Sequence, residues 1–75
     1  MSKRLDRVAA LYDDVAAELE RAAAHAAVAA QHFRDENVPR GSAHAWAVHG
    51  HILEARARLE EQAREHARLS VPDAG

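Results

Sequence analysis

The chain has 75 residues, enough for one domain at most, and it has no cysteine, which excludes disulfides and thiolate metal sites. Its formal net charge of -2, with histidine neutral, argues against a general binder of nucleic acids or other polyanions. No apolar run approaches the roughly 20 residues of a membrane span, and no apolar segment follows the basic residues near the start as in a secretory signal. We therefore expect a cytoplasmic protein. The excess of arginine over lysine and the many alanines indicate a bacterial gene of high GC content.

A helical pattern covers residues 3–36. Apolar residues recur there at alternating steps of three and four, without glycine or proline, as in the a and d positions of a packed helix. Ser2 precedes the pattern and is a suitable N-cap. We expect the packed face of this helix to consist of Leu5, Val8, Tyr12, Val15, Leu19, Ala22, Ala26, Ala29 and Phe33.

A strip of alanines runs beside this face. The alanines are spaced by heptads, so they share one side of the helix and leave a flat surface that another helix can approach closely. The alternative is that codon bias and the high helix propensity of alanine account for them. A second packing surface would consist of Ala9, Ala16, Ala23 and Ala30.

Turn signals cluster in residues 37–42. Val38 precedes Pro39, which disfavours helical geometry at Val38. Gly41 accommodates a positive φ, and Ser42 is a suitable cap for a following helix. Alternatively, Pro39 is itself the first residue of that helix. Either connection is short, and short connections join antiparallel neighbours.

A second helical pattern covers residues 43–70, and residues 71–75 are expected to form a loose tail. The pattern weakens toward its end, where Gln62 and His66 occupy positions on the packed face. That face is predicted to consist of Ala45, Val48, Ile52, Ala55, Leu59, Gln62, His66 and Leu69.

The two patterns predict a single all-α domain, an antiparallel two-helix hairpin packed like a coiled coil. Two registers are compatible with the apolar residues. One places Phe33 opposite Val48, and a slipped one places Leu19 opposite Leu59.

A two-helix hairpin leaves apolar surface uncovered, because each helix covers only one side of the other. Chains of this size rarely gain more than roughly 3–5 kcal/mol from one core, and many rely on oligomerisation or a bound metal. Trp46 and Leu53 lie on the flank of the second helix, outside the packed face, unless Trp46 folds over the turn. Exposed apolar patches with aromatic residues mark interfaces. We predict a homodimer, a four-helix bundle whose interface includes Phe33, Trp46, Leu53, Ala16, Ala23 and Ala30.

Four of the six histidines share one spacing. His25 and His32 are seven residues apart on the first helix, and His44 and His51 are seven apart on the second. In an antiparallel pair these flanks face each other, so His32 should lie near His44 or His51. Such imidazoles would bind a divalent transition metal, or would act as a pH switch when they become charged. The alternative is that they are surface side chains bonded to water or carboxylates, and no zinc or di-iron motif is present. The predicted metal ligands are His25, His32, His44 and His51.

The predicted function is that of a non-catalytic protein–protein interaction module acting as a homodimeric bundle, with an unidentified protein partner, no membrane and no resident cofactor. No nucleophile–base arrangement or phosphate-binding loop is present. The alternative is a bundle lined by histidine that binds metal or senses pH. Nucleic-acid binding through Arg56, Arg64 and Arg68 is disfavoured, because neighbouring glutamates offset these charges.

Overall fold

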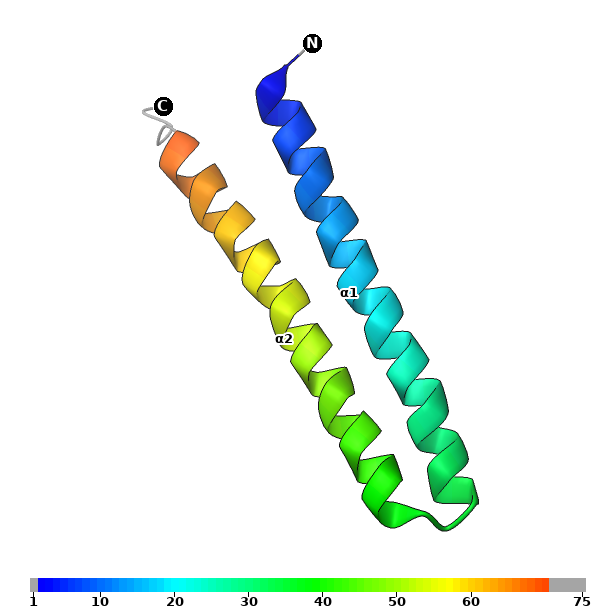
Figure 1. Ribbon diagram of the computed structural model, residues 1–75. Coiled ribbons are helices and arrows are strands. Elements are labelled where there is room, and N and C mark those ends of the chain that lie inside the picture. The colour runs from blue at the N-terminus through cyan, green and yellow to red at the C-terminus, as the bar shows by residue number, and fades with distance from the viewer. Residues whose placement is uncertain (1, 71–75) are drawn as a thin grey trace.

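The computed structural model describes residues 2–70, which form two helices, α1 (Lys3–Arg34) and α2 (Val38–Leu69). The helices lie side by side and antiparallel, joined by a short turn at one end, with both chain ends at the other (Figure 1). The hairpin is a rod of 60 × 28 × 15 Å. The predicted all-α hairpin is therefore confirmed, whereas the predicted tail at residues 71–75 lies outside the described residues.

The turn closes α1 with a recognised C-cap motif. The backbone N–H of Glu36 donates to the carbonyl of Phe33 (3.1 Å), and the N–H of Asn37 donates to the carbonyl of His32 (2.7 Å). These are the two hydrogen bonds of a Schellman motif, which requires one residue with positive φ. Glu36 supplies it, with φ of 58°, in place of the more usual glycine. The first helix consequently ends at Arg34 and does not continue to residue 36.

The turn is shorter than residues 37–42, and that prediction was wrong. Asn37 is the N-cap of α2, because its side chain accepts from the backbone N–H of Arg40 (3.3 Å). Val38 and Pro39 are the first helical residues, where the N–H that proline lacks would have no helical partner in any case. Ser42 lies inside the helix and does not cap it. The alternative, in which the helix begins at Pro39, is correct to within one residue, because α2 begins at Val38.

Gly41 is in the helix as well, and it is needed for a close approach and not for a positive φ. A Cβ atom at this position would lie 2.7 Å from Cε1 of Phe33. Phe33 therefore packs on Gly41 and does not lie opposite Val48. Neither expected register is correct. Because the turn is short, each residue of α2 lies opposite a position on α1 that is closer to the turn-distal end than either register predicted.

The two helices meet along one row of small side chains. Half of the predicted packed face lies in this row, and its most buried members, at 3–7% exposure, are Val15, Ala22, Ala29 and Ala55. The other half of the prediction was wrong, since seven large apolar residues expected inside are 42–62% exposed. They are Leu5, Tyr12, Leu19, Phe33, Ile52, Leu59 and, at the free end, Leu69.

A row that is polar except for Leu11 takes the place of these large residues between the helices. Each member is half-buried, and successive members are seven residues apart along each helix. The row consists of Leu11, Glu18, His25 and His32 on α1 and His44, His51, Arg58 and Glu65 on α2. Both helices are thus rotated from the predicted orientation, so that histidines lie inside the hairpin contact and large apolar side chains lie outside it. Within residues 2–70 neither helix contains a stretch that is long and apolar enough to cross a membrane.

Candidate functional sites

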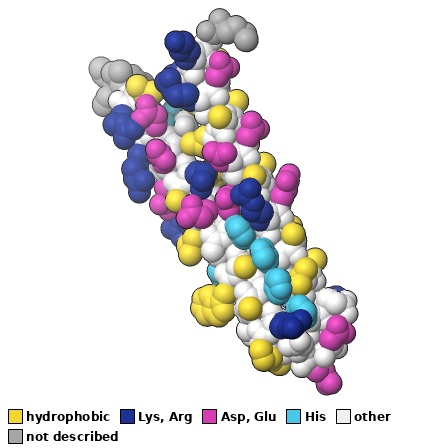
Figure 2. Space-filling view, viewed as in Figure 1, with side chains coloured by type: hydrophobic (Ala, Val, Ile, Leu, Met, Phe, Trp, Pro, Cys, Tyr) yellow, Lys and Arg dark blue, Asp and Glu magenta, His cyan; other side chains and the backbone are white. Residues whose placement is uncertain are grey.

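Four histidines from alternate helices form a continuous stack, which we call the histidine ladder. In spatial order its members are His32, His44, His25 and His51, and successive ring centroids are 5.4, 5.2 and 5.3 Å apart. Figure 2 shows histidine side chains in a row along the hairpin, in the half nearest the turn. The prediction that His32 lies beside His44 or His51 is confirmed for His44.

Two hydrogen bonds hold the ladder together across the helices. Nδ1 of His25 and Nδ1 of His44 are 2.9 Å apart, so one ring donates its N–H and the other accepts. At the end of the ladder, the Nδ1–H of His51 donates to Oε2 of Glu18 (2.7 Å). The side chains of Glu18 and His51 are only 12% and 27% exposed, so this bond is partly shielded from water.

Glu18 is the acidic end of this network. The hydrogen bond from His51 holds the pKa of Glu18 below its ordinary value of 4.5, against the opposing effect of partial desolvation, and the positive charges of Arg21 and Arg58 act in the same direction as the bond. Arg21 Nη1 donates to the second oxygen of this carboxylate (2.9 Å). Arg58 also lies 3.9 Å from Asp14 across the helices. The carboxylate of Glu18 is therefore ionised at neutral pH.

Glu18 was not among the predicted site residues, although the sequence contains a signal for it. Glu18 precedes His25 by the same seven residues that separate His25 from His32, and Arg58 follows His51 by seven. Extending the histidine spacing along each helix leads directly to both residues. Metal binding by the ladder stays a prediction, and within residues 2–70 no group of three or more His, Asp or Glu side chains is placed to hold a metal ion.

The opposite side of the hairpin is apolar. Helical periodicity places six of the exposed large residues on the side of the central row away from the ladder. The neighbouring alanines of α1 are largely exposed too, with Ala30 half-buried and Ala16 and Ala23 open to solvent. We call this surface the apolar face, defined by Leu5, Tyr12, Leu19, Phe33, Ile52 and Leu59.

Trp46 and Leu53 lie further round α2, seven residues or about two helical turns apart on its outer side. Trp46 is 76% exposed, so it does not fold over the turn to cover the end of its own hairpin, and Leu53 is 62% exposed. The indole ring contacts only the imidazole of His49 among the described aromatic pairs, with ring centroids 5.9 Å apart. The prediction that these two side chains stay uncovered by α1 is confirmed.

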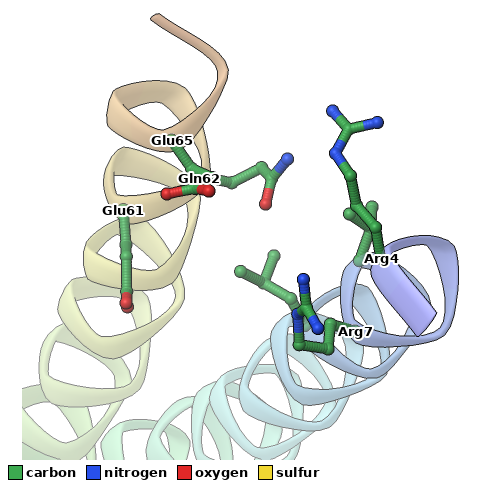
Figure 3. Close-up of a pocket in the computed structure, with 7 residues that line it drawn as sticks. Arg4, Arg7, Glu61, Gln62 and Glu65 are labelled. Atoms are coloured by element: carbon green, nitrogen blue, oxygen red, sulfur yellow. The ribbon is translucent and has the colours of Figure 1, made fainter. Parts of the chain in front are cut away.

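A groove of about 300 Å³ lies between the helices near their free ends. Arg4 and Arg7 line it from α1, and Glu61, Gln62 and Glu65 line it from α2, with Gln62 reaching toward the space between them (Figure 3). Val8 and Leu11 complete the lining. The helices are therefore less closely packed at this end than at the turn.

The arginines considered for nucleic-acid binding are paired along α2. Arg56 bonds Glu60 (2.7 Å), and Arg64 lies 3.7 Å from the same carboxylate. Arg68 pairs with Glu65. These glutamates offset the positive charge of each arginine locally.

Comparison of the chain with known proteins identifies no relative. The chain matches no protein-family model, and neither the curated proteins nor the solved structures contain a significant match to it.

Proposed function

We propose that this protein is a non-catalytic interaction module that works as a homodimer, in which two hairpins pack their apolar faces together into a four-helix bundle. One observation carries the proposal. The hairpin buries one valine and three alanines as its core, and it leaves six large apolar side chains exposed on a single face.

The surface area supports a second copy as the occupant of that face. The accessible surface is 5922 Å² for 8.2 kDa, whereas a globular chain of this mass would expose about 4,500 Å². The excess is larger than the roughly 800 Å² that each partner buries in a standard interface. The apolar face also presents the heptad-spaced residues that helices use to pack in four-helix bundles.

The geometry of such a dimer assigns roles to the predicted interface residues. Phe33 belongs to the apolar face, and the exposed Ala16 and Ala23 beside it allow close approach of a partner helix. Trp46 and Leu53 lie at the rim of that face, where aromatic side chains often anchor interfaces. The ladder lies on the other side of each hairpin and stays at the outer surface of the bundle.

Sedimentation equilibrium between micromolar and hundred-micromolar concentrations tests the proposal. We expect a dimer whose melting temperature rises with protein concentration, because association stabilises only the folded chain. Leu19→Glu places a carboxylate at the middle of the apolar face, and a symmetric dimer contains two of them. The substitution should therefore raise the dissociation constant roughly a hundredfold or more. Trp46→Ala should weaken the dimer less, since it lies at the rim.

Ala24→Glu is the matched control. It adds the same charge to the exposed far side of α1 and should leave the dimer intact. A monomer at every concentration, with a sharp melting transition that does not depend on concentration, would exclude the proposed bundle.

A further inference from the structure

We propose that the histidine ladder makes the half of the hairpin nearest the turn acid-labile, so that α1 and α2 separate there when the four imidazoles gain more than one proton. The structural basis is that the ladder bridges the two helices along one edge of their contact, where its four histidines are half-buried. Its rings alternate between α1 and α2, so repulsion among them acts directly to part the helices.

The bond between His25 and His44 is the sensitive point. An imidazole that accepts a hydrogen bond must have an unprotonated nitrogen. If both rings are protonated, neither Nδ1 accepts, and two cations face each other where the nitrogens were 2.9 Å apart. His32 and His51 stack on this pair, so further protons add like charges within one ring spacing. Imidazoles change charge between pH 5 and 8, so this repulsion develops in mildly acidic solution.

Among the ion pairs of residues 2–70, the charges around the ladder compensate one of these protons. Glu18 bonds His51 and is the carboxylate in contact with the ladder among the described ion pairs. It is already shared with Arg21. The next arginine, Arg58, lies close enough to act on Glu18 and is itself paired with Glu54 (3.0 Å) and near Asp14. Protonated His51 is therefore stabilised by Glu18, whereas the imidazoles beyond it have no such carboxylate among these pairs.

The acid response of Glu18 falls in a different pH range. Its folded-state pKa is lowered, so the stability it contributes is present above the ordinary value of 4.5 and is lost only as the pH falls through the lowered one. Glu18 thus stays ionised between pH 7.5 and 5.5.

Apolar burial between the helices is small in this half. The apolar residues of α1 that are buried here are Ala22 and Ala29, whose side chains are small. Repulsion in the ladder therefore meets weak apolar resistance. Because the ladder lies opposite the apolar face, protons reach it in a dimer as well as in a monomer.

Thermal unfolding followed by circular dichroism at pH 7.5 and 5.5, at one protein concentration, tests the inference. The melting temperature should fall by roughly 5 °C or more on acidification. The double variant His25→Gln, His44→Gln removes two of the charges that would face each other, so most of this fall should disappear. Hydrogen exchange should show that amides around Ala22 and Ala29 lose protection at pH 5.5 before those near residue 8 do.

His49→Gln is the matched control, because His49 is an exposed histidine of α2 that contacts Trp46 and lies outside the ladder. It should retain the full acid response. Equal melting temperatures at the two pH values would overturn the inference, as would a double variant as acid-sensitive as the wild type.

The acid response arises within a single chain and does not require the dimer. At pH 7.5 the double variant should sediment as the wild type does, whereas Leu19→Glu should keep its acid response and lose dimerisation. A failure of the proposed acid response can therefore be distinguished from a failure of the proposed dimer.

Discussion

The turn half and the open half of the hairpin use the same helices in different ways. Near the turn, small residues bring the backbones close, and Phe33 packs directly on Gly41. Near the free ends, Val8 and Leu11 are larger and only half-buried, and a groove lies between the helices. Close packing in this molecule thus coincides with small side chains, and large apolar side chains do not fill its centre.

This difference indicates how the hairpin distributes its apolar surface. A close contact built from alanine and glycine excludes bulky residues, so those residues point to the apolar face, where a partner is needed to cover them. The open half has room between the helices and should be more tolerant of added volume. The two halves should therefore respond in opposite ways to the same kind of substitution.

The largest contrast should come from enlarging one side chain in each half. Ala29→Leu inserts three carbons at a position that is 6% exposed, and should lower the free energy of unfolding by about 2–3 kcal/mol. Val8→Leu adds one methylene beside the groove and should be neutral or stabilising. Urea denaturation of both variants at the same protein concentration measures the contrast. Equal losses would show that the two halves are packed alike.

The two helical glycines sharpen the comparison. In Gly50→Ala the added Cβ has no neighbouring atom within 4 Å, so the higher helix propensity of alanine should raise the free energy of unfolding by about 1 kcal/mol. Gly41→Ala brings the same increase in helix propensity, but its Cβ displaces the Phe33 ring. We expect the Gly41 variant to be less stable than the Gly50 variant by about 1–3 kcal/mol.

A double-mutant cycle checks the cause of that difference. In the background of Phe33→Ala the ring is gone, so Gly41→Ala should become as favourable as Gly50→Ala. If Gly41→Ala stays unfavourable without the ring, then the backbone of α1, and not Phe33, limits the space at Gly41.

The two helices and the Ser2 cap were predictable because they depend on local patterns. Apolar spacing of three and four residues, without glycine or proline inside residues 3–34, suffices for a helix wherever it packs. The extent of the turn was not predictable, because a glycine close to proline favours a turn by local propensity alone. Gly41 is required by the Phe33 ring, a tertiary contact that local propensity does not contain.

The rotation of the helices was not predictable from the apolar residues alone. Val15 and Ala22 lie between the helices in both the predicted and the observed rotation. The two rotations differ in which neighbouring residue joins them there, Leu19 on one side or Glu18 on the other. An apolar pattern favours Leu19 inside. The structure places Glu18 inside with its histidine, and this arrangement leaves Leu19 for the apolar face. The spacing of the histidines carried this information, because residues seven apart on facing helices also form a row.

The smallest contrast compares the two N-caps, which have the same geometry in different halves. Ser2 accepts from the N–H of Leu5 and Asn37 accepts from the N–H of Arg40, both at 3.3 Å. Asn37→Ala should cost about 1 kcal/mol, because Asn37 caps α2 at the turn that joins the helices. Ser2→Ala should cost less, since helix ends near a chain terminus fray and contribute little to global stability.

Asn37→Gly, which preserves much of the cap preference, should cost only a few tenths of a kcal/mol. Thermal unfolding of the three variants ranks them, and a Ser2 variant as damaging as the Asn37 variant would mean that the open end is held as firmly as the turn.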